Sequence, residues 1–465
     1  MKRKMLLASG LLIAIFSFYL AVQKSTGRSE PPNIVIILAD DLGWGDVGYH
    51  GSEIMTPNID KLAKQGIELN RFYVAPVCSP TRAGLLTGRY PNRFGLRETV
   101  IPPWRDFGLD PEEELLPEVL AKAGYKNRAI LGKWHLGHSS KKYYPLENGF
   151  THFYGHLNGA IDYFTLEREN ELDWHNDYES SYDKGYSTEL ITEEAVKCIK
   201  SYSKEGPFFL YVAYNAPHTP LQAKKEDLEL YGYDASQAGK NEKPTPRQKY
   251  SAMVTNMDRG IGKIHEALKE AGVEDHTFFL FFSDNGADEG SKGGSSGALR
   301  GHKFQEWEGG VRAAAFVKWP AGFEGGRKSD QVTGYVDVLP TVKDIIGDRT
   351  PSPRKLDGIS ILPALKDENV TIDRHFYLGM GALVTQEWKI IKANRNPKMN
   401  VTEDLLFKID EDELERRNVI QEYPEIYKKL DRLVYGYDTI TSPFAVAPYG
   451  EGREGFVAPK EWKVE

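Results

Sequence analysis

Cysteine is scarce in this sequence. Its 465 residues contain two cysteines, Cys78 and Cys198, too few for a fold held together by disulfide bonds. A single bridge between them is one alternative. However, the helical spacing of Ile191, Ala195 and Ile199 around Cys198 predicts that this thiol lies on a buried helix face. Cys78 therefore needs an explanation of its own.

An excess of positive charge is also lacking. The chain has 59 lysines and arginines against 67 acidic residues, a formal net charge of −8. A general nucleic-acid binder needs a basic face that displaces phosphate counterions, so the composition argues against that class. Any anionic ligand must meet a local basic pocket. With 40% hydrophobic and 12% aromatic residues, the chain has enough apolar surface for one large domain or two packed ones.

The N-terminus has the pattern of a leader sequence. A basic stretch, Lys2–Lys4, precedes an apolar run from Met5 to Val22. We interpret residues 1–27 as a signal peptide, which predicts export to the periplasm or secretion. The run is long for a signal peptide, so an uncleaved membrane anchor stays as the alternative. Cleavage near Gly27 leaves 55 basic against 67 acidic residues, or −12.

Short apolar runs alternate with helical stretches along the first 350 residues, which is typical of an α/β fold. Beyond residue 348 the chain is more polar and irregular, so we predict a catalytic domain at 28–348 and a smaller C-terminal subdomain at 349–465. The expected strands are 33–39, 69–74, 126–131, 208–214, 277–283, 388–393 and 405–409, and the expected helices are 59–66, from 80 onward, 115–123, 253–271 and 424–434.

Polar residues follow the ends of several predicted strands. In open α/β sheets ligands bind beyond the carboxyl ends of the strands, where side chains from distant segments converge. We therefore expect one site that gathers Asp40, Asp41, Lys133, His135, His218, Asp284 and Asn285.

The segment Cys78-Ser79-Pro80-Thr81-Arg82 has a physical logic of its own. A proline two residues after the cysteine favours a helix that begins there. The positive end of the helix dipole and its free N–H groups would then face Cys78. The pattern predicts an anion site with a nucleophile inside it.

This segment, continued by Leu86-Thr87-Gly88-Arg89, resembles the C-x-P-x-R signature of type I sulfatases of the alkaline-phosphatase-like superfamily. The resemblance covers nearly the whole chain after the leader. It implies a large mixed β-sheet sandwiched by helices, with a smaller C-terminal α+β subdomain. It also implies that a maturation enzyme oxidises Cys78 to formylglycine.

Asp40, Asp41, Asp284 and Asn285 supply four hard oxygen ligands and no imidazole or thiolate. Such a set suits calcium or, less well, magnesium, and not zinc. An Asp-Asp pair alone is usually a helix cap or a turn. The matching positions of sulfatases bind calcium, which also contacts the formylglycine at Cys78, so the resemblance favours the metal.

Three further segments match sulfatase motifs: G-K-W-H-L-G at 132–137, P-H-T-P at 217–220, and R-G-H-K followed by W-E-G-G-V-R at 300–312. The resemblance implies that Arg82 and Lys133 favour ionisation of the nucleophile and that His135 later accepts its remaining proton. It further implies that His218, helped by Lys303, protonates the leaving oxygen. Arg300 and His302 are candidate substrate contacts, with a purely structural role as the alternative.

Four segments resemble the arylsulfatase B, or N-acetylgalactosamine-4-sulfatase, branch and bacterial polysaccharide sulfatases. They are H-T-P-L-Q at 218–222, R-G-x-K at 300–303, residues 160–164, and Trp174-His175. The resemblance implies a sulfated carbohydrate substrate, with Trp174 and His175 contacting a sugar. The scarcity of cysteine suits an exported bacterial enzyme. The rival hypotheses are a phosphonate or phosphodiester hydrolase of the same superfamily and a non-catalytic glycan-binding relative.

Overall fold

The computed structural model describes residues 30–97, 99–234, 243–444 and 446–463. The predicted signal peptide, 1–27, lies outside the described residues. Within these ranges, no helix has both the length and the apolar character that crossing a membrane requires. Cys78 and Cys198 are both free and buried, so the alternative of a bridge between them is wrong.

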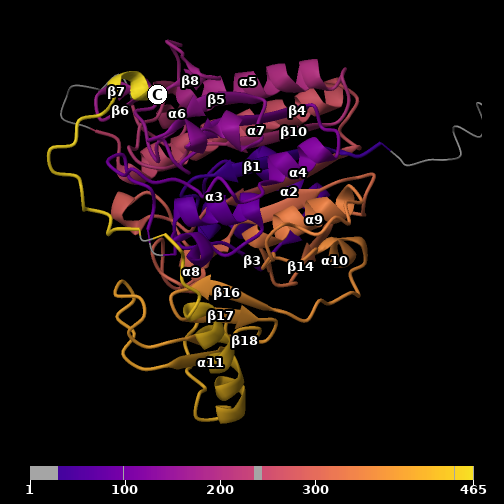
Figure 1. The fold of residues 1–465 in the computed structure, drawn as a ribbon, viewed down its shortest axis with the longest axis vertical. Helices are drawn as coiled ribbons and strands as arrows, with labels where there is room; N and C mark the ends of the chain where they lie inside the picture. The colour runs from indigo at the N-terminus through magenta and orange to yellow at the C-terminus, as the bar shows by residue number, and fades with distance from the viewer. Residues whose placement is uncertain (1–29, 98, 235–242, 445, 464–465) are drawn as a thin grey trace, which may run out of the picture.

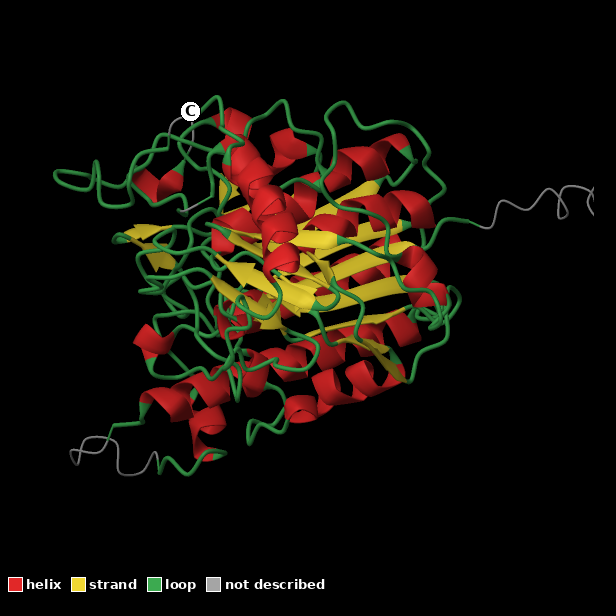
Figure 2. Cartoon of the chain, turned by 90° about the horizontal axis from the view of Figure 1, so that it is seen from below, coloured by secondary structure: helices red, strands yellow, loops and turns green. Residues whose placement is uncertain are grey.

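A large mixed sheet runs through the centre of the molecule (Figures 1 and 2). Its five central strands are parallel, and antiparallel strands adjoin them on both sides. The predicted α/β class with a large mixed sheet is thus confirmed. In spatial order the strands are β14 (Arg327–Ser329), β2 (Ile67–Leu69), β13 (Ala315–Lys318), β11 (Thr277–Ser283), β1 (Asn33–Ala39), β10 (Phe208–Ala213), β4 (Asn127–Lys133), β5 (His152–His156), β8 (His175–Asn176) and β9 (Glu179–Ser180).

Helices cover both faces of this sheet, as Figure 2 shows from below. The central strand β1 is buried along its whole length, and alternate residues enter two separate cores: Ile34 and Ile36 face one, Val35 and Ile37 the other. The first core contains residues of α3 (Cys78–Thr87), α4 (Leu116–Lys122), α9 (Val338–Ile345) and α10 (Leu362–Lys366); the second contains residues of α2 (Pro57–Gln65), α5 (Ser187–Tyr202) and α7 (Pro246–Glu270). Cys198 lies on the buried face of α5, as predicted.

The later part of the chain forms a second, antiparallel sheet of four strands, which α11 covers (Figure 1). The segment after α11 then returns to the first region, where the ring of Trp462 packs edge-on against His138 at 5.3 Å. The four strands are β16 (His375–Gly379), β17 (Ala382–Thr385), β18 (Trp388–Ile391) and β19 (Leu405–Lys408), and α11 is Pro424–Asp438.

The remaining elements are short. A three-stranded sheet and a β-hairpin flank the main sheet, and two short helices lie in the connections. They are β12 (Arg312–Ala313), β3 (Phe72–Tyr73) and β15 (Thr333–Gly334), the hairpin β6 (Glu167–Arg168) and β7 (Glu171–Leu172), and the helices α6 (Lys225–Glu229) and α8 (Glu308–Val311).

Several element boundaries differ from the expected ones. β4 continues to Lys133, so this lysine ends the strand instead of following it. α3 begins at Cys78, two residues before Pro80, which occupies its first turn. α7 begins at Pro246, seven residues before the expected start, because the Thr245 hydroxyl caps it by accepting a hydrogen bond from the amide of Gln248. The antiparallel strands β16 and β17 were not predicted.

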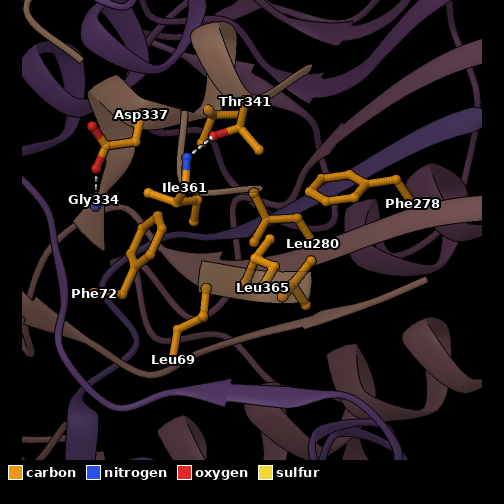
Figure 3. A pocket seen from close by; sticks show the side chains of 11 residues that line it. Leu69, Phe72, Phe278, Leu280, Gly334, Asp337, Thr341, Ile361 and Leu365 are labelled. Carbon is orange, nitrogen blue, oxygen red and sulfur yellow. Dashed lines mark hydrogen bonds between the residues drawn. The ribbon is translucent and has the colours of Figure 1, made fainter. Parts of the chain in front are cut away.

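A small cavity lies in the first core, between β11 and the helices α9 and α10 (Figure 3). Its volume is about 10 Å³ and its lining is apolar. The nearby polar groups are already paired: the Thr341 hydroxyl accepts from the Ile361 amide at 3.0 Å, and the Asp337 carboxylate from the Gly334 amide at 2.8 Å. Such a space is too small and too apolar for a ligand.

Candidate active site

The predicted site residues converge beyond the carboxyl ends of the central strands. Asp40 and Asp41 follow β1, Lys133 ends β4, and Asp284 and Asn285 follow β11. β1 lies between β11 and β10 and pairs with both, and β4 pairs with β10. Parallel strands therefore bring to one edge residues that are almost 250 positions apart in the sequence.

Cys78 is the first residue of α3 and is buried at this edge. Its thiol donates a hydrogen bond to Asp40 Oδ1 at 3.5 Å. Burial, followed by the negative charge of Asp284, raises the pKa of the thiol far above its ordinary value. An unmodified Cys78 is therefore a neutral thiol, and the thiolate that nucleophilic attack by cysteine requires does not form.

Arg82 lies one turn after Cys78 in α3 and is fully buried. Its guanidinium contacts Asp284 Oδ2 through Nη2 at 2.8 Å and through Nε at 3.1 Å, and its Nη1 donates to the Lys133 carbonyl at 3.1 Å. Burial alone would lower its pKa, but the Asp284 carboxylate raises the pKa above its ordinary value. Lys133 Nζ lies 2.6 Å from Asp40 Oδ2. Two basic side chains thus lie near Cys78.

The four predicted metal ligands are all buried here. The Asn285 amide nitrogen donates to Asp41 Oδ1 at 2.7 Å and to the Gly286 carbonyl at 2.9 Å. Its oxygen Oδ1 is buried and, among the described residues, has no hydrogen-bond partner. A buried amide oxygen without a partner, on a side chain that contacts Asp41, fits a hard cation, which would satisfy it.

Ligand atoms of Asp40, Asp41, Cys78 and His218 lie within 4.8 Å of one another. Burial works against ionisation of Asp41, yet the charge of Lys303 and that of His218 hold the pKa of this carboxyl below its ordinary value. Asp284 differs, because burial and the Asp40 carboxylate raise its pKa. Crowded carboxylates of this kind are stabilised by a cation.

His135 has one occupied and one free ring nitrogen. Its Nε2 lies 3.1 Å from the Ile101 carbonyl, which accepts only if this nitrogen carries the hydrogen. Its Nδ1 is buried without a partner among the described residues. Burial, then the charges of Lys133 and Arg82, lower the pKa of the ring. His135 is therefore a neutral imidazole whose free nitrogen can accept a proton.

His218 and Lys303 approach Asp41 from two other loops. Lys303 Nζ lies 2.6 Å from Asp41 Oδ1, and His218 Nε2 lies 3.6 Å from Asp41 Oδ2. The other nitrogen of His218 contacts the Thr219 carbonyl at 2.6 Å, which leaves Nε2 for chemistry. Burial lowers the pKa of His218 to about 4. The His218 side chain is still 18% exposed, so it stands at the entrance of the site.

Asp41 and His135 both have left-handed backbone conformations, with φ of 64° and 58°. Non-glycine residues pay about 1 kcal/mol or more for such conformations, which cluster at functional sites. Neighbouring groups hold both residues. The Tyr250 hydroxyl donates to the Asp41 carbonyl at 2.9 Å, and the Ser79 hydroxyl donates to the His135 carbonyl at 2.9 Å.

The prediction that Trp174 and His175 contact a sugar is wrong. Both side chains are buried, and Trp174 packs edge-on against Tyr154 at 5.2 Å in the second core. The Nε2 atom of His175 lies 3.2 Å from the buried carboxylate of Asp173. Trp174 also stacks on His156 at 6.3 Å, and His175 is only 1% exposed.

Arg300 and His302 lie near the entrance and keep part of their surface open. The Arg300 guanidinium stacks on Trp307 at 3.6 Å, and its Nη1 donates to the Glu415 carbonyl at 2.9 Å. The Nε2 of His302 lies 2.7 Å from Glu289. These contacts give both residues a structural role, and substrate contact stays a prediction.

The sequence did not indicate the residues that hold the catalytic side chains in position. The Tyr163 hydroxyl donates to the carbonyls of Asn215 and His218 at 2.5 and 2.8 Å and so fixes the His218 loop. Gly159 lies directly against His135, since a Cβ on it would be 2.4 Å from the ring. Gly159 lies in an irregular segment that no motif marks, and the resemblance of the segment 160–164 to arylsulfatase B gave Tyr163 no role.

Comparison with known proteins supports the geometry. A sulfatase family model matches residues 32–347. Mouse arylsulfatase J is 31% identical over 92% of this chain and 79% of the relative. Human N-acetylgalactosamine-6-sulfatase is 36% identical over 73% of this chain and 67% of the relative.

Solved structures agree. The structure of Ps i-CgsB in complex with a k-i-k-neocarrahexaose superimposes with a TM-score of 0.80 at 30% identity, covering 91% of this chain and 96% of the other. The PsFucS1 sulfatase from Pseudoalteromonas sp. gives a TM-score of 0.72 at 25% identity, over 89% and 91% of the two chains. Both the fold and the arrangement of its elements are thus shared along almost the whole length of these enzymes.

Proposed function

Since the chain belongs to the sulfatase family and is a sulfuric ester hydrolase, we propose that it removes sulfate from a carbohydrate through a formylglycine derived from Cys78. The observation that carries this proposal is the position of Cys78: the first residue of a buried helix, next to Asp40 and within one turn of Arg82. An anionic ester that reaches this point meets the helix N-terminus and several cations.

A formylglycine at position 78 supplies a nucleophile that an unmodified cysteine does not. The thiol of Cys78 is neutral in its surroundings, whereas the hydrated aldehyde supplies one hydroxyl as nucleophile and a second through which the aldehyde is regenerated. A formylglycine-generating maturation enzyme is then a required partner. The predicted export of the chain belongs to the same proposal.

Asp40, Asp41, Asp284 and the unpartnered oxygen of Asn285 would hold the metal. We propose calcium, with magnesium as the less suitable ion, because carboxylate and amide oxygens suit its flexible coordination. A bound divalent cation supplies positive charge next to the oxygens of the sulfate group. Arg82, which pairs with Asp284, and Lys133, which pairs with Asp40, add to that charge.

Two proton transfers are assigned to this chain's own residues. The free Nδ1 of His135 accepts the proton of the second hydroxyl, since Nε2 is engaged with Ile101. The departing sugar oxygen needs a proton. Burial favours neutral His218, while Lys303 stays charged because the carboxylate of Asp41 raises its pKa against the effect of burial. Lys303 therefore gives up a proton that His218 Nε2 accepts and passes to the leaving oxygen, and Lys303 regains a proton from solvent afterwards.

A leaving-group comparison tests this assignment. Lys303→Ala is expected to slow release of sulfate from a sugar alcohol at least about tenfold more than release from an aryl sulfate, because a phenolate leaves without a proton. Equal losses on both substrates would remove Lys303 from the proton transfer.

The substrate we propose is a sulfated saccharide attacked at its non-reducing end. The chain without its predicted leader has a net charge of −12, so a long anionic polymer is not attracted to the general surface. His218 is only partly open, and the other catalytic side chains are buried, so the entrance is narrow. A narrow basic pocket suits one terminal sulfated sugar. The neocarrahexaose bound to Ps i-CgsB and the name of the human relative support a saccharide.

The decisive experiment combines mass spectrometry with a substrate panel. Peptides that contain residue 78 should show the thiol-to-aldehyde mass change in active enzyme, and unmodified cysteine in a fully active sample would overturn the mechanism. Aryl sulfate, aryl phosphate and defined sulfated oligosaccharides are then compared. Preference for phosphate esters would favour the rival hydrolase, and equally fast release of internal and terminal sulfates would contradict action from the chain end.

A further inference from the structure

A pocket of about 730 Å³ lies where the C-terminal segment crosses the loop that contains Trp104 and Arg105. Its wall includes aromatic side chains from both segments and from the turn after β9: Trp104, Phe456, Trp462 and Tyr182. The aromatic ring of Tyr182 is 69% exposed. Figure 1 shows the C-terminal segment, in yellow, returning beside β6 and β7 to this side of the molecule.

This pocket adjoins the active site through a shared backbone segment. The Ile101 carbonyl accepts the hydrogen of His135, and two residues later the Pro103 carbonyl contacts His138 Nε2 at 2.8 Å. Pro103 and His138 both line the pocket. The catalytic imidazole and the pocket therefore contact the same short backbone segment, at Ile101 and at Pro103.

The charge of the pocket is opposite to that of the whole chain. Three basic side chains, Arg105, Lys460 and Lys463, line it against two acidic ones, Asp106 and Glu461. Lys463 is paired with Glu461 at 3.2 Å. The guanidinium of Arg105 contacts only the carbonyls of Ala447 and Pro448, and Lys460 forms no ion pair within the part of the chain that the structure describes.

The C-terminal segment is fastened on both sides of the pocket. Trp104 Nε1 donates to the Tyr449 carbonyl at 2.8 Å, and Trp462 Nε1 donates to the Arg168 carbonyl at 3.0 Å. The Ser180 hydroxyl donates to Glu461 at 2.9 Å. The pocket is therefore a built feature of the fold, with walls that hydrogen bonds hold in place.

We propose that this pocket is a second saccharide subsite, which binds a further sulfated sugar of the same chain while the terminal sugar is in the active site. Aromatic faces beside polar groups are what a pyranose ring contacts, and uncompensated cations suit a second sulfate. The inference rests on the proposed function and extends it: the preferred substrate is an oligosaccharide with more than one sulfate, and the C-terminal segment determines that preference.

The test compares substrates of different length on three variants. The enzyme is assayed on an aryl sulfate and on a hexasaccharide that it desulfates, with the hexasaccharide in two forms, with and without sulfate on the inner sugars. Tyr182→Ala removes an exposed aromatic ring, and Lys460→Glu reverses an unpaired charge. Val457→Ala is the matched control, because Val457 lies in the same segment, is 85% exposed and does not line the pocket.

The measured quantity is the ratio of kcat/KM for the hexasaccharide to kcat/KM for the aryl sulfate. Tyr182→Ala should lower this ratio about tenfold for both hexasaccharides, mainly through KM. Lys460→Glu should lower it about tenfold only when the inner sugars are sulfated, and Val457→Ala should leave it within twofold. Ratios within twofold of the wild type for both pocket variants would overturn the subsite. A wild-type enzyme that hydrolyses no sulfate ester at all would overturn the proposed function, and the subsite with it.

Discussion

Two of the buried charge clusters among the described residues differ in their access to solvent. One is the active site at the carboxyl ends of the central strands. The other joins α8 of the first region to β18 of the antiparallel sheet. The first contains Asp40, Asp41, Asp284, Arg82, Lys133 and Lys303, and the second contains Glu308, Glu415, Lys389 and Arg312.

The second cluster is closed. Lys389 Nζ lies 2.8 Å from Glu308 and 2.9 Å from Glu415, and all three side chains are sealed from solvent. Both clusters retain buried atoms without a hydrogen-bond partner among the described residues, Glu415 Oε1 in the second and Asn285 Oδ1 and His135 Nδ1 in the active site, but the active site opens to solvent at His218. Similar charges thus serve two purposes: the active site is an open network that can receive ligands, whereas the second cluster is a closed network, sealed from solvent, that holds two parts of the chain together.

The largest effect is expected from a change in the open network. Asp40→Asn keeps the shape of the side chain but removes a charge that faces Lys133 and a proposed metal ligand. We expect kcat/KM to fall at least about 10³-fold, because charge preorganised around the reacting group supplies much of catalysis. Elemental analysis should show less bound calcium. Loss of the ion pair with buried Lys133 should lower stability, and the end of the repulsion between Asp40 and Asp284 should offset part of that cost.

Asp258→Asn is the matched control. This carboxylate accepts hydrogen bonds from Asn58 and from the Ile59 amide at the start of α2, away from the active site. Its replacement should lower stability and leave the specific activity of the folded enzyme intact. Full activity of Asp40→Asn after exhaustive chelation would contradict the proposed metal site.

A change in the closed network should have the reverse effect, a loss of stability without a loss of activity. Lys389→Met leaves two buried carboxylates without their shared cation, and breaking such a buried pair costs about 3–5 kcal/mol of unfolding free energy. Urea denaturation measures the loss, while the folded variant keeps its specific activity. Lys392→Met is the control, because its partners Asp404 and Asp431 are partly exposed and such pairs contribute about 1 kcal/mol or less. Equal losses of unfolding free energy in Lys389→Met and Lys392→Met would show that burial does not distinguish the two ion-pair networks.

The sequence predicted the open network far better than the closed one. Cys78, Arg82 and Lys303 lie in motifs, and Asp40 and Asp284 follow apolar runs whose bounds matched β1 and β11. Glu308 lies in the W-E-G-G-V-R motif and Lys389 in a predicted strand, but neither pattern indicates that the two meet, because that depends on how the antiparallel sheet docks. Trp174 failed for a related reason: an aromatic residue in a loop-like segment looks available to a sugar until its packing against Tyr154 is known.

A further buried carboxyl, Glu306, sharpens the comparison because it forms no ion pair with any residue that the structure describes. It accepts a hydrogen bond from the Asn396 amide at 2.7 Å, and burial raises its pKa to about 7. The folded state therefore holds this proton more tightly than the unfolded state. Its contribution to stability is complete below pH 4.5 and is lost as the pH rises to 7.

Glu306→Gln should remove this part of the pH dependence. A pKa that moves from 4.5 to about 7 corresponds to about 3 kcal/mol between these pH values. Chemical denaturation at pH 4.5, 6 and 8 measures it as the difference between variant and wild type. The exposed Glu229→Gln serves as control and should reproduce the wild-type slope. A slope of Glu306→Gln equal to that of the wild type would show that Glu306 is ionised throughout.

The smallest effect is expected at Arg300, which lies between the two networks. Its guanidinium stacks on Trp307 and donates to the Glu415 carbonyl, while its backbone leads to Lys303. An exposed cation–π contact contributes about 0.5–1 kcal/mol, so Arg300→Ala should lower stability by about 1 kcal/mol. Arg300→Lys keeps the charge and loses the planar stacking, so it separates the two contributions. If Arg300 also contacts the substrate, KM for a sulfated saccharide rises about tenfold in Arg300→Ala and less in Arg300→Lys. If Arg300→Ala lowers stability without changing KM for the saccharide, the role of Arg300 is structural only.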